Sequence, residues 1–348
     1  MKQFFYLAGF CILTLTACKG GFKKGLNGLE YKIISMGGKE EPHYGDYIQM
    51  HMKRVYSGTK DTVLGDSREF MPKIQIFDSV KTPLEYYNVI RQMRKGDSLV
   101  FRILTDSAFK NSPEGMPPFA KKGKYIYTYL KLVNIFRTLP EADSANKAEY
   151  FSSRPRVFRK QFEEVGTELT KDKAQMEKDN KIITDYLSKN NIKAEKTRWG
   201  TYVSIISEGT GQQITGNSIV SVNYTGRTLD SGKVFDSNVD PKFNHVRPYE
   251  VNMGELAGSG GGVIFGWTDA LLQLRGGSKA VIFIPSSLAY GKGGNGEIIK
   301  PNDCIIFDIE VKDAITEKEA IAKQEKMQQE MQQLEKMRQD SLLKATKK

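Results

Sequence analysis

The chain has 348 residues, of which 27% are charged and 39% hydrophobic, and it carries a formal net charge of +11. This length accommodates two modest domains with connecting segments. The charge suggests a nucleic-acid-binding protein, but the lysines are spread along the whole chain instead of forming one patch, which argues against that class. Loose attraction to anionic membrane surfaces and simple solubility both explain a basic surface.

The first 18 residues predict a secretory signal peptide of lipoprotein type. They contain Lys2, a short apolar run and the ending Leu15-Thr-Ala-Cys18, and the run is too short to span a bilayer comfortably. Cys18 is the predicted lipid attachment site, which implies a membrane-anchored protein on the exported side of the cell envelope and no nucleic-acid partner. An ordinary signal peptide that contains Cys18 and is cleaved elsewhere is the alternative.

Processing at this site leaves Cys304 as the one thiol without a lipid in the mature chain, because Cys11 is removed with the signal peptide. No disulfide can then form within one mature chain. An apolar run follows Cys304, so we expect a small buried hydrophobic residue on a strand.

Residues 27–137 form the first predicted domain, and part of it is an internal repeat. Gln92–Phe109 follows the same pattern as Gln273–Tyr290 over eighteen ungapped positions. Three further segments alternate as half-buried strands do and have counterparts after residue 199. These pairs are Tyr31–Ser35 with Val203–Ser207, Ile48–Met52 with Val220–Tyr224, and Tyr125–Val133 with Cys304–Lys312.

Residues 138–198 predict a helical linker with two amphipathic helices. The apolar positions that mark them are Phe158, Phe162, Val165 and Leu169 in the first, and Ile182, Ile183, Tyr186 and Leu187 in the second. We expect both helices to pack against a domain, with a dimerisation surface as the alternative.

Residues 314–348 predict a solvated helical tail, since Glu317–Leu343 lacks Gly and Pro and is rich in Glu, Lys, Gln and Met. Met327, Met331 and Leu334 share one face, but the seam does not continue through enough heptads to predict a coiled coil.

Between linker and tail, residues 220–312 place aromatic and aliphatic residues around turns, with no plausible nucleophile, metal cluster or phosphate cradle. The motifs in chain order are Val222-Asn-Tyr-Thr-Gly226, Gly232-Lys-Val-Phe-Asp236, Val263-Ile-Phe-Gly-Trp267, Ser287-Leu-Ala-Tyr-Gly291 and Cys304-Ile-Ile-Phe-Asp308. This ordered set resembles the FK506-binding-protein (FKBP) family of peptidyl-prolyl cis-trans isomerases. The resemblance implies an antiparallel sheet wrapped on a short helix, Gly266–Leu274, and no cofactor or metal.

The resemblance also implies a role for each site residue. The expected catalytic residues are Tyr224, Phe235, Asp236, Trp267, Tyr290 and Phe307, and the expected substrate-binding residues are Tyr249, Val263, Ile264, Asn295 and Ile299. Trp267 corresponds to the floor under the proline ring, and Tyr290 to the hydroxyl that bonds a substrate carbonyl. The implied partners are Pro-containing segments of folding exported proteins and FK506-type ligands.

This chain departs from the family pattern in three places. Asn295 stands at a loop tip where many family members carry a histidine, and the segments 238–247 and 254–262 are longer than in compact relatives. The preference at the residue before proline is therefore open.

The N-terminal copy lacks the groove residues. Leu64-Gly-Asp66 aligns approximately with Val234-Phe-Asp236, Tyr86 replaces Trp267, Thr128 or a neighbour replaces Phe307, and Phe109 replaces Tyr290. These changes keep the scaffold and remove the apolar floor, so we predict a non-catalytic domain.

Three other motifs do not support competing functions. Gly291–Gly296 satisfies the dinucleotide-binding fingerprint by letter, but an alternating strand follows it instead of a helix. His43, His51 and His245 have no carboxylate or cysteine at ligand spacing, which argues against a metal site. No Gly-x-Ser-x-Gly elbow surrounds a serine such as Ser286, which argues against a hydrolase.

The sequence thus predicts an α+β protein in which two FKBP-like domains, 27–137 and 199–313, are joined by helical segments and followed by a C-terminal helix. The leading function is that of a lipid-anchored peptidyl-prolyl isomerase. A peptide-binding chaperone or envelope scaffold with little isomerase activity is the alternative, and a purely architectural tether is a third.

Overall fold

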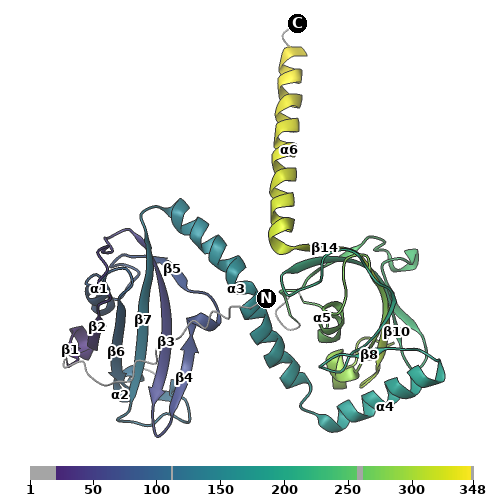
Figure 1. Cartoon of the computed structure of the whole chain (residues 1–348), viewed down its shortest axis with the longest axis horizontal. Coiled ribbons are helices and arrows are strands. Elements are labelled where there is room, and N and C mark those ends of the chain that lie inside the picture. Colours follow the sequence, from purple (N-terminus) through teal and green to yellow (C-terminus); the bar gives the residue numbers. More distant parts are fainter. Residues whose placement is uncertain (1–20, 111–112, 257–261, 346–348) are drawn as a thin grey trace, which may run out of the picture. The chain divides into compact units, whose positions relative to one another are not determined.

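The computed structural model describes residues 21–110, 113–256 and 262–345. Two compact units divide the chain, Met1–Tyr150 and Phe151–Lys348, coloured purple to teal and teal to yellow in Figure 1. The predicted signal peptide and the predicted lipid attachment site, Cys18, lie outside the described residues. Among the helices that are described, none is long and apolar enough to cross a membrane.

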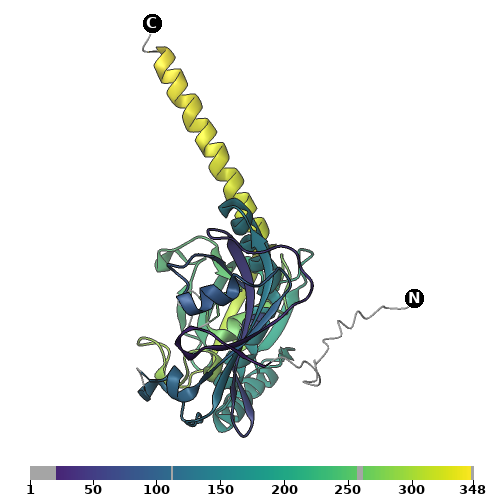
Figure 2. The same ribbon diagram turned by 90° about the vertical axis from the view of Figure 1, so that its left-hand side faces the viewer.

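The N-terminal unit is built on one antiparallel sheet. Its strands are β1 (Lys23–Lys24), β2 (Glu30–Ile34), β3 (Tyr47–Ser57), β4 (Asp61–Asp66), β5 (Lys73–Ile76), β6 (Ser98–Leu104) and β7 (Tyr125–Phe136). They are arranged in the order β1-β2-β6-β7-β3-β4, and β5 also pairs with β3. Helix α1 (Leu84–Ile90) lies across the sheet, as seen in Figure 2. Val89, Ile90 and Met93 pack with the inward side chains of the strands to form the core of this unit; the short helix α2 (Thr105–Ala108) follows β6.

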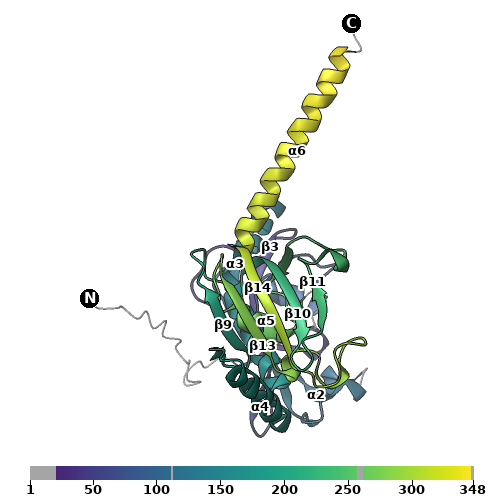
Figure 3. The same ribbon diagram turned by 90° about the vertical axis from the view of Figure 1, so that its right-hand side faces the viewer.

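The C-terminal unit repeats this sheet strand for strand. Its strands are β8 (Glu195–Lys196), β9 (Tyr202–Ser207), β10 (Ser218–Thr228), β11 (Val234–Ser237), β12 (Tyr249–Asn252), β13 (Lys279–Ile284) and β14 (Ile305–Thr316). The order is β11-β10-β14-β13-β9-β8, with β12 also on β10, and Figure 3 shows the sheet curving around helix α5 (Phe265–Leu271). The helix ends three residues earlier than the resemblance implies, since Leu272–Leu274 form tighter turns in which Gln273 N donates to Ala270 O and Leu274 N to Leu271 O.

The shared strand order confirms the predicted α+β fold, in which an antiparallel sheet wraps a short helix twice. Four of the six predicted strand segments lie within longer observed strands, whereas Tyr31–Ser35 and Cys304–Lys312 each overrun β2 or β14 by one residue. Alternation identifies the half-buried centre of a strand better than its ends. The two-residue strands β1 and β8 are missing from the prediction, because a pair of residues carries no periodic signal.

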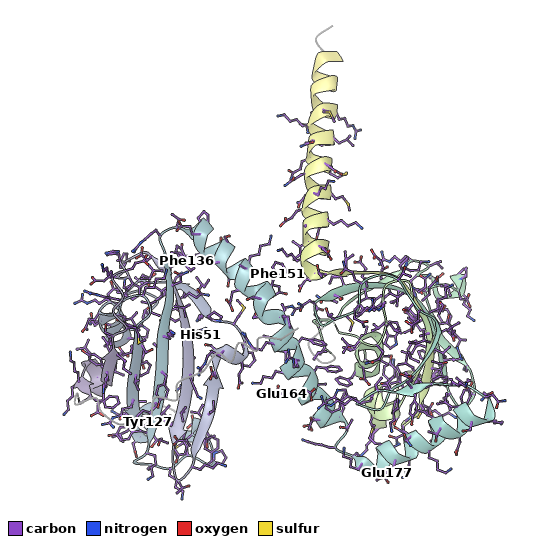
Figure 4. The ribbon with its side chains drawn as sticks, viewed as in Figure 1. His51, Tyr127, Phe136, Phe151, Glu164 and Glu177 are labelled. Atoms are coloured by element: carbon purple, nitrogen blue, oxygen red, sulfur yellow. The ribbon has the colours of Figure 1, made fainter. Side chains whose placement is uncertain are left out.

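Two helices precede the second sheet, and they pack on it as predicted. They are α3 (Leu139–Leu169) and α4 (Lys173–Lys189). Phe158 is buried, and Phe162, Val165 and Leu169 pack against the core of the C-terminal unit. In α4, Ile183 and Leu187 are buried against Phe283 and Ile306, whereas Ile182 is 46% exposed. Glu164 and Glu177, labelled in Figure 4, lie on the solvent side of these helices.

The tail is helix α6 (Glu317–Ala345), which confirms the predicted solvated helix. Met327, Met331 and Leu334 are all more than half exposed. Arg154 of α3 donates a hydrogen bond from Nε to Glu317 Oε2 at 3.0 Å, which joins the first turn of α6 to α3.

Candidate functional site

A cavity of about 650 Å³ opens on the concave side of the C-terminal sheet. This volume falls in the range that accommodates small ligands or a short peptide segment. All eleven residues expected from the sequence line it: Tyr224, Phe235, Asp236, Tyr249, Val263, Ile264, Trp267, Tyr290, Asn295, Ile299 and Phe307. The fold thus brings together residues that are up to 83 positions apart, and their individual roles stay predictions.

Four strands, one helix and one loop supply most of these side chains. Strands β10, β11, β12 and β14 carry the aromatic walls, and helix α5 begins directly beneath them with Trp267 in its first turn. The loop after β13 contributes Tyr290 and then folds back on itself, because Asn295 N donates to Ile299 O at 2.8 Å. This hairpin places Asn295 and Ile299 in the lining of the cavity.

The floor of the cavity is a set of perpendicular aromatic rings. Trp267 and Phe307 are each 4% exposed, with ring centroids 5.0 Å apart and planes at 88°. Tyr224 meets Trp267 edge-on at 5.1 Å, and Phe235 meets Phe307 at 5.5 Å. Edge-to-face pairs of this kind are favourable beyond their area burial, so the floor is rigid as well as apolar.

Gly226 makes this packing possible, and it was not among the residues expected from the sequence. A Cβ at this position would lie 2.5 Å from Phe307 Cε1 and 2.7 Å from Phe235 Cε2. No side chain can occupy that space unless both rings move. Nothing in the sequence pattern around Gly226 distinguishes it from an ordinary turn glycine.

Gly226→Ala is therefore expected to displace both rings and to lower kcat/KM for prolyl peptide isomerisation about tenfold, since overpacking costs about 1–3 kcal/mol. Isomerase kinetics together with thermal unfolding would measure this. Gly65→Ala is the control, because Gly65 also lies in a strand, β4 of the N-terminal unit, and a Cβ there meets no atom within 4 Å. Wild-type kinetics for Gly226→Ala would contradict the assigned packing.

Asp236 is the main polar group on the cavity wall, and two side chains hold it. The Tyr224 hydroxyl donates to Asp236 Oδ2 at 2.7 Å, and His245 Nε2 lies 3.1 Å from Asp236 Oδ1. Burial, followed by this hydrogen bond to Asp236, raises the pKa of Tyr224 well above its usual range. Tyr224 therefore stays protonated and orients the carboxylate.

Tyr290 places a second hydroxyl in the cavity. Burial raises the pKa of Tyr290, while a hydrogen bond with Asn295 acts in the opposite direction. The hydroxyl is accordingly neutral at physiological pH and able to donate a hydrogen bond to a carbonyl oxygen.

Four lining residues were missed by sequence reasoning: Gly262, Gly296, Glu297 and Ile298. Each lies within two residues of an expected residue in the chain, so adjacency is the signal that could have found them. Glu297 is exposed and adds a second carboxylate to the rim.

Helix α4 supports the segment that carries Tyr290. Asp179 is fully buried; it accepts hydrogen bonds from Ser286 Oγ at 2.6 Å and from Gln175 Nε2 at 2.7 Å. Asp172, at the start of the helix, pairs with Lys292 Nζ at 3.0 Å. Because Ser286 and Lys292 flank Tyr290, α4 holds this loop on both sides.

The N-terminal unit has different side chains at the corresponding positions. Pairing across β3, β4 and β7 puts Arg54 opposite Thr128, where the C-terminal unit has Gly226 opposite Phe307. The bulge in β3–β4 also places Leu64, not Gly65, at the position of Phe235. The approximate sequence alignment was therefore off by one residue here, because the turns before the two strands, residues 58–60 and 229–233, differ in length and the sequence does not show where the gap falls.

The fold and the aromatic cavity define a protein with an FKBP-type groove. The family model for FKBP-type peptidyl-prolyl cis-trans isomerases matches residues 211–312. The FK506-binding protein 1 of Debaryomyces hansenii is 37% identical over 112 residues, covering 32% of this chain and 91% of that protein. The chain therefore belongs to the FKBP-type peptidyl-prolyl cis-trans isomerase family.

Bacterial relatives extend the similarity beyond the family domain. The probable isomerase FkpA of Neisseria meningitidis is 34% identical over 139 residues, which cover 40% of this chain and 46% of that protein. This chain thus spans about half the length of the curated bacterial relatives that it matches. The crystal structure of FkpA from Escherichia coli is 26% identical and covers 52% of this chain and 74% of that chain, with a TM-score of 0.33.

Proposed function

We propose that this protein is a peptidyl-prolyl cis-trans isomerase whose active site is the aromatic cavity of the C-terminal unit. The observation that carries the proposal is the buried floor of Trp267 and Phe307 beneath two oriented hydroxyls, those of Tyr224 and Tyr290. Membership of the family supports it independently.

The reaction needs no bond to be broken, only rotation about a peptide bond. The barrier is about 18–20 kcal/mol because the amide loses resonance at the perpendicular geometry, and cis and trans are close in energy only before proline. The twisted amide is less polar than the planar one. A dry aromatic cavity that holds the proline ring therefore binds the transition state more tightly than the ground state, which is what lowers the barrier.

The chain's residues divide this work. Trp267 is the surface on which the proline ring lies, and Phe235, Tyr249, Val263 and Phe307 enclose it. The Tyr290 hydroxyl donates to a substrate carbonyl. Ile264 precedes α5 with extended backbone angles (φ −54°, ψ 145°) that suit pairing with an extended peptide, and Asp236 orders the polar edge. Asn295 and Ile299 contact the residue before proline.

We further propose that the substrates are exported proteins that are still folding, and that the protein is held at the membrane through Cys18. This part rests on residues 1–18, whose pattern is that of a lipoprotein signal peptide. Mass spectrometry of the mature N-terminus tests it, since a diacylated Cys18 is the expected species and an unmodified residue elsewhere would contradict it.

The isomerase itself is tested by a protease-coupled assay on the purified protein with short peptides varied at the residue before proline. Turnover that an FK506-type groove ligand inhibits is the expected result. Ligand binding by calorimetry without turnover would leave a peptide-holding cavity and would refute the catalytic role. Neither turnover nor binding would refute both.

The N-terminal unit supports a second candidate, a peptide-binding chaperone. Its concave face exposes Met52 and Leu64, by 44% and 38%, instead of enclosing a dry floor. Such a surface suits transient contacts with unfolded chains. The test uses a client protein whose folding is not limited by proline. The full chain with Trp267→Leu is expected to suppress aggregation of this client as well as the wild type does. Loss of this suppression in the variant would show that the C-terminal cavity, and not the N-terminal unit, holds the client.

A further inference from the structure

The loop between β11 and β12 carries a histidine that the sequence pattern treated as isolated. His245 is 42% exposed in its side chain and brings Nε2 to within 3.1 Å of Asp236 Oδ1, on the cavity wall. Its other ring nitrogen, Nδ1, lies 2.7 Å from the backbone carbonyl oxygen of Phe243. The imidazole thus joins its own loop to the polar edge of the groove.

Both ring nitrogens face hydrogen-bond acceptors, and this decides the protonation state that fits. A carbonyl oxygen and a carboxylate oxygen cannot donate, so each nitrogen must carry a proton to make its contact. A neutral imidazole carries one proton and satisfies one of the two. The doubly protonated imidazolium satisfies both and adds attraction to the carboxylate.

The two ends of the loop are held in place by Asn238, independently of His245. Asn238 is 1% exposed, and its Nδ2 donates to Val222 O at 2.9 Å and Arg247 O at 2.8 Å. The loop therefore keeps its two ends on the sheet whatever the charge of His245. What His245 controls is the middle of the loop and the free oxygen of the Asp236 carboxylate.

Other charged and titratable groups lie near this contact, and most of them make contacts of their own. Tyr224 of β10 donates to the second oxygen of Asp236 at 2.7 Å, and Tyr249 of β12 packs on Tyr224 with ring centroids 6.2 Å apart. Within the loop, Lys242 pairs with Asp240 at 3.0 Å, and Arg247 lies two residues after His245. Across the cavity, burial and then the charge of Asp236 raise the pKa of Tyr290. Among these residue types, histidine is the one whose charge ordinarily changes between pH 5 and 8.

We infer that His245 is a positioning residue of the groove, which in its protonated form clamps Asp236 and the 238–248 loop against the cavity and so tightens the binding of prolyl peptides. The kinetic consequence of this inference rests on the proposed isomerase function. The contact of His245 with Asp236 does not depend on that function. When pH rises and the imidazole becomes neutral, one of its two contacts is lost and the wall is less ordered before the peptide binds. Turnover of bound peptide depends on the aromatic floor and is unaffected.

The kinetic test measures kcat and KM separately from pH 5.5 to pH 8.5 for the wild type, His245→Gln and His245→Arg. In the wild type KM is expected to rise about threefold across this range at constant kcat, the size of effect typical of a partly exposed charge pair. His245→Gln should have the higher KM at every pH, and His245→Arg, which stays positive, should have the lower KM at every pH. The same pH slope in all three proteins would overturn the inference.

A second measurement separates this inference from the isomerase proposal. Backbone amide NMR signals of Asp236, Val239, Asp240 and residues 242–246 are expected to move between pH 5.5 and 8.5 in the wild type and to stay in place in His245→Gln. If these signals move and no protein turns over peptide, the isomerase proposal fails and the clamp stands. If they are as pH-sensitive in His245→Gln as in the wild type, the clamp is refuted whatever the kinetics.

Discussion

Replacing Trp267 with leucine is expected to lower kcat/KM for prolyl peptide isomerisation by about thirty- to a hundredfold. The indole supplies most of the flat apolar surface at the base of the cavity, where it meets Tyr224 and Phe307 at 5.1 and 5.0 Å. Leucine keeps the site apolar but removes that surface, and losing the contact of a buried aromatic ring corresponds to about 2–3 kcal/mol of transition-state binding. Peptide isomerisation kinetics measure the loss.

The chain contains a matched control, since its other tryptophan lies in the same unit but outside the cavity. Trp199 packs edge-on against Phe162 and Phe265 with ring centroids 6.2 and 6.1 Å apart. Trp199→Leu should lose stability much as Trp267→Leu does, because both remove a large ring from a packed interior. It should keep its activity below the unfolding temperature. Equal activity losses in the two variants would show that general loosening, and not the floor, controls turnover.

The strands and the floor of the site were predictable because both correspond to local patterns in the sequence. Alternation at two-residue spacing identifies β3, β7, β10 and β14. The repeat at 92–109 and 273–290 shows that the same turn and strand, β6 and β13, occur twice. The aromatic floor was accessible because each ring belongs to a short motif in a fixed order.

The parts of the site that were missed depend on distances that no motif encodes. Gly226 matters because two rings from other strands meet above it, and His245 matters because an eleven-residue loop, 238–248, returns to β11. The role of Leu64 follows from a bulge between paired strands. In each case the role of the residue depends on where a second, distant segment of the chain lies.

The linker helices show the same limit on a larger scale. The sequence separates 138–198 from the isomerase domain, yet α4 lies on the convex side of the C-terminal sheet and covers Phe283 and Ile306. Amphipathic spacing indicates that a helix will pack but not against which surface. This helix was predicted from its apolar positions alone. The contact of its buried carboxylate, Asp179, with the loop that carries Tyr290 could therefore not be recognised.

Asp179→Ala is expected to destabilise the C-terminal unit by about 3 kcal/mol, because it leaves the buried Ser286 hydroxyl and the partly buried Gln175 amide without their acceptor. For a unit of this size that corresponds to a fall in Tm of about 6–12 °C. Tryptophan fluorescence measures it for this unit alone, since both tryptophans, Trp199 and Trp267, belong to it.

Burial also raises the pKa of the neighbouring Cys304 thiol to about 12, so the thiol stays neutral and cannot replace the carboxylate as a strong acceptor.

Two further variants decide whether the hydrogen bonds or the packing of Asp179 cause this effect. Asp179→Asn has nearly the same shape but only one acceptor oxygen, so it should lose about half as much stability as Asp179→Ala. Ser286→Ala removes one donor, and combined with Asp179→Ala it should cost less than the sum of the single changes, because the hydroxyl left unpaired is then absent. Strict additivity would mean that Asp179 and Ser286 act independently. Coupling would establish that α4, which precedes the family domain in the chain, is a structural part of the loop that presents Tyr290.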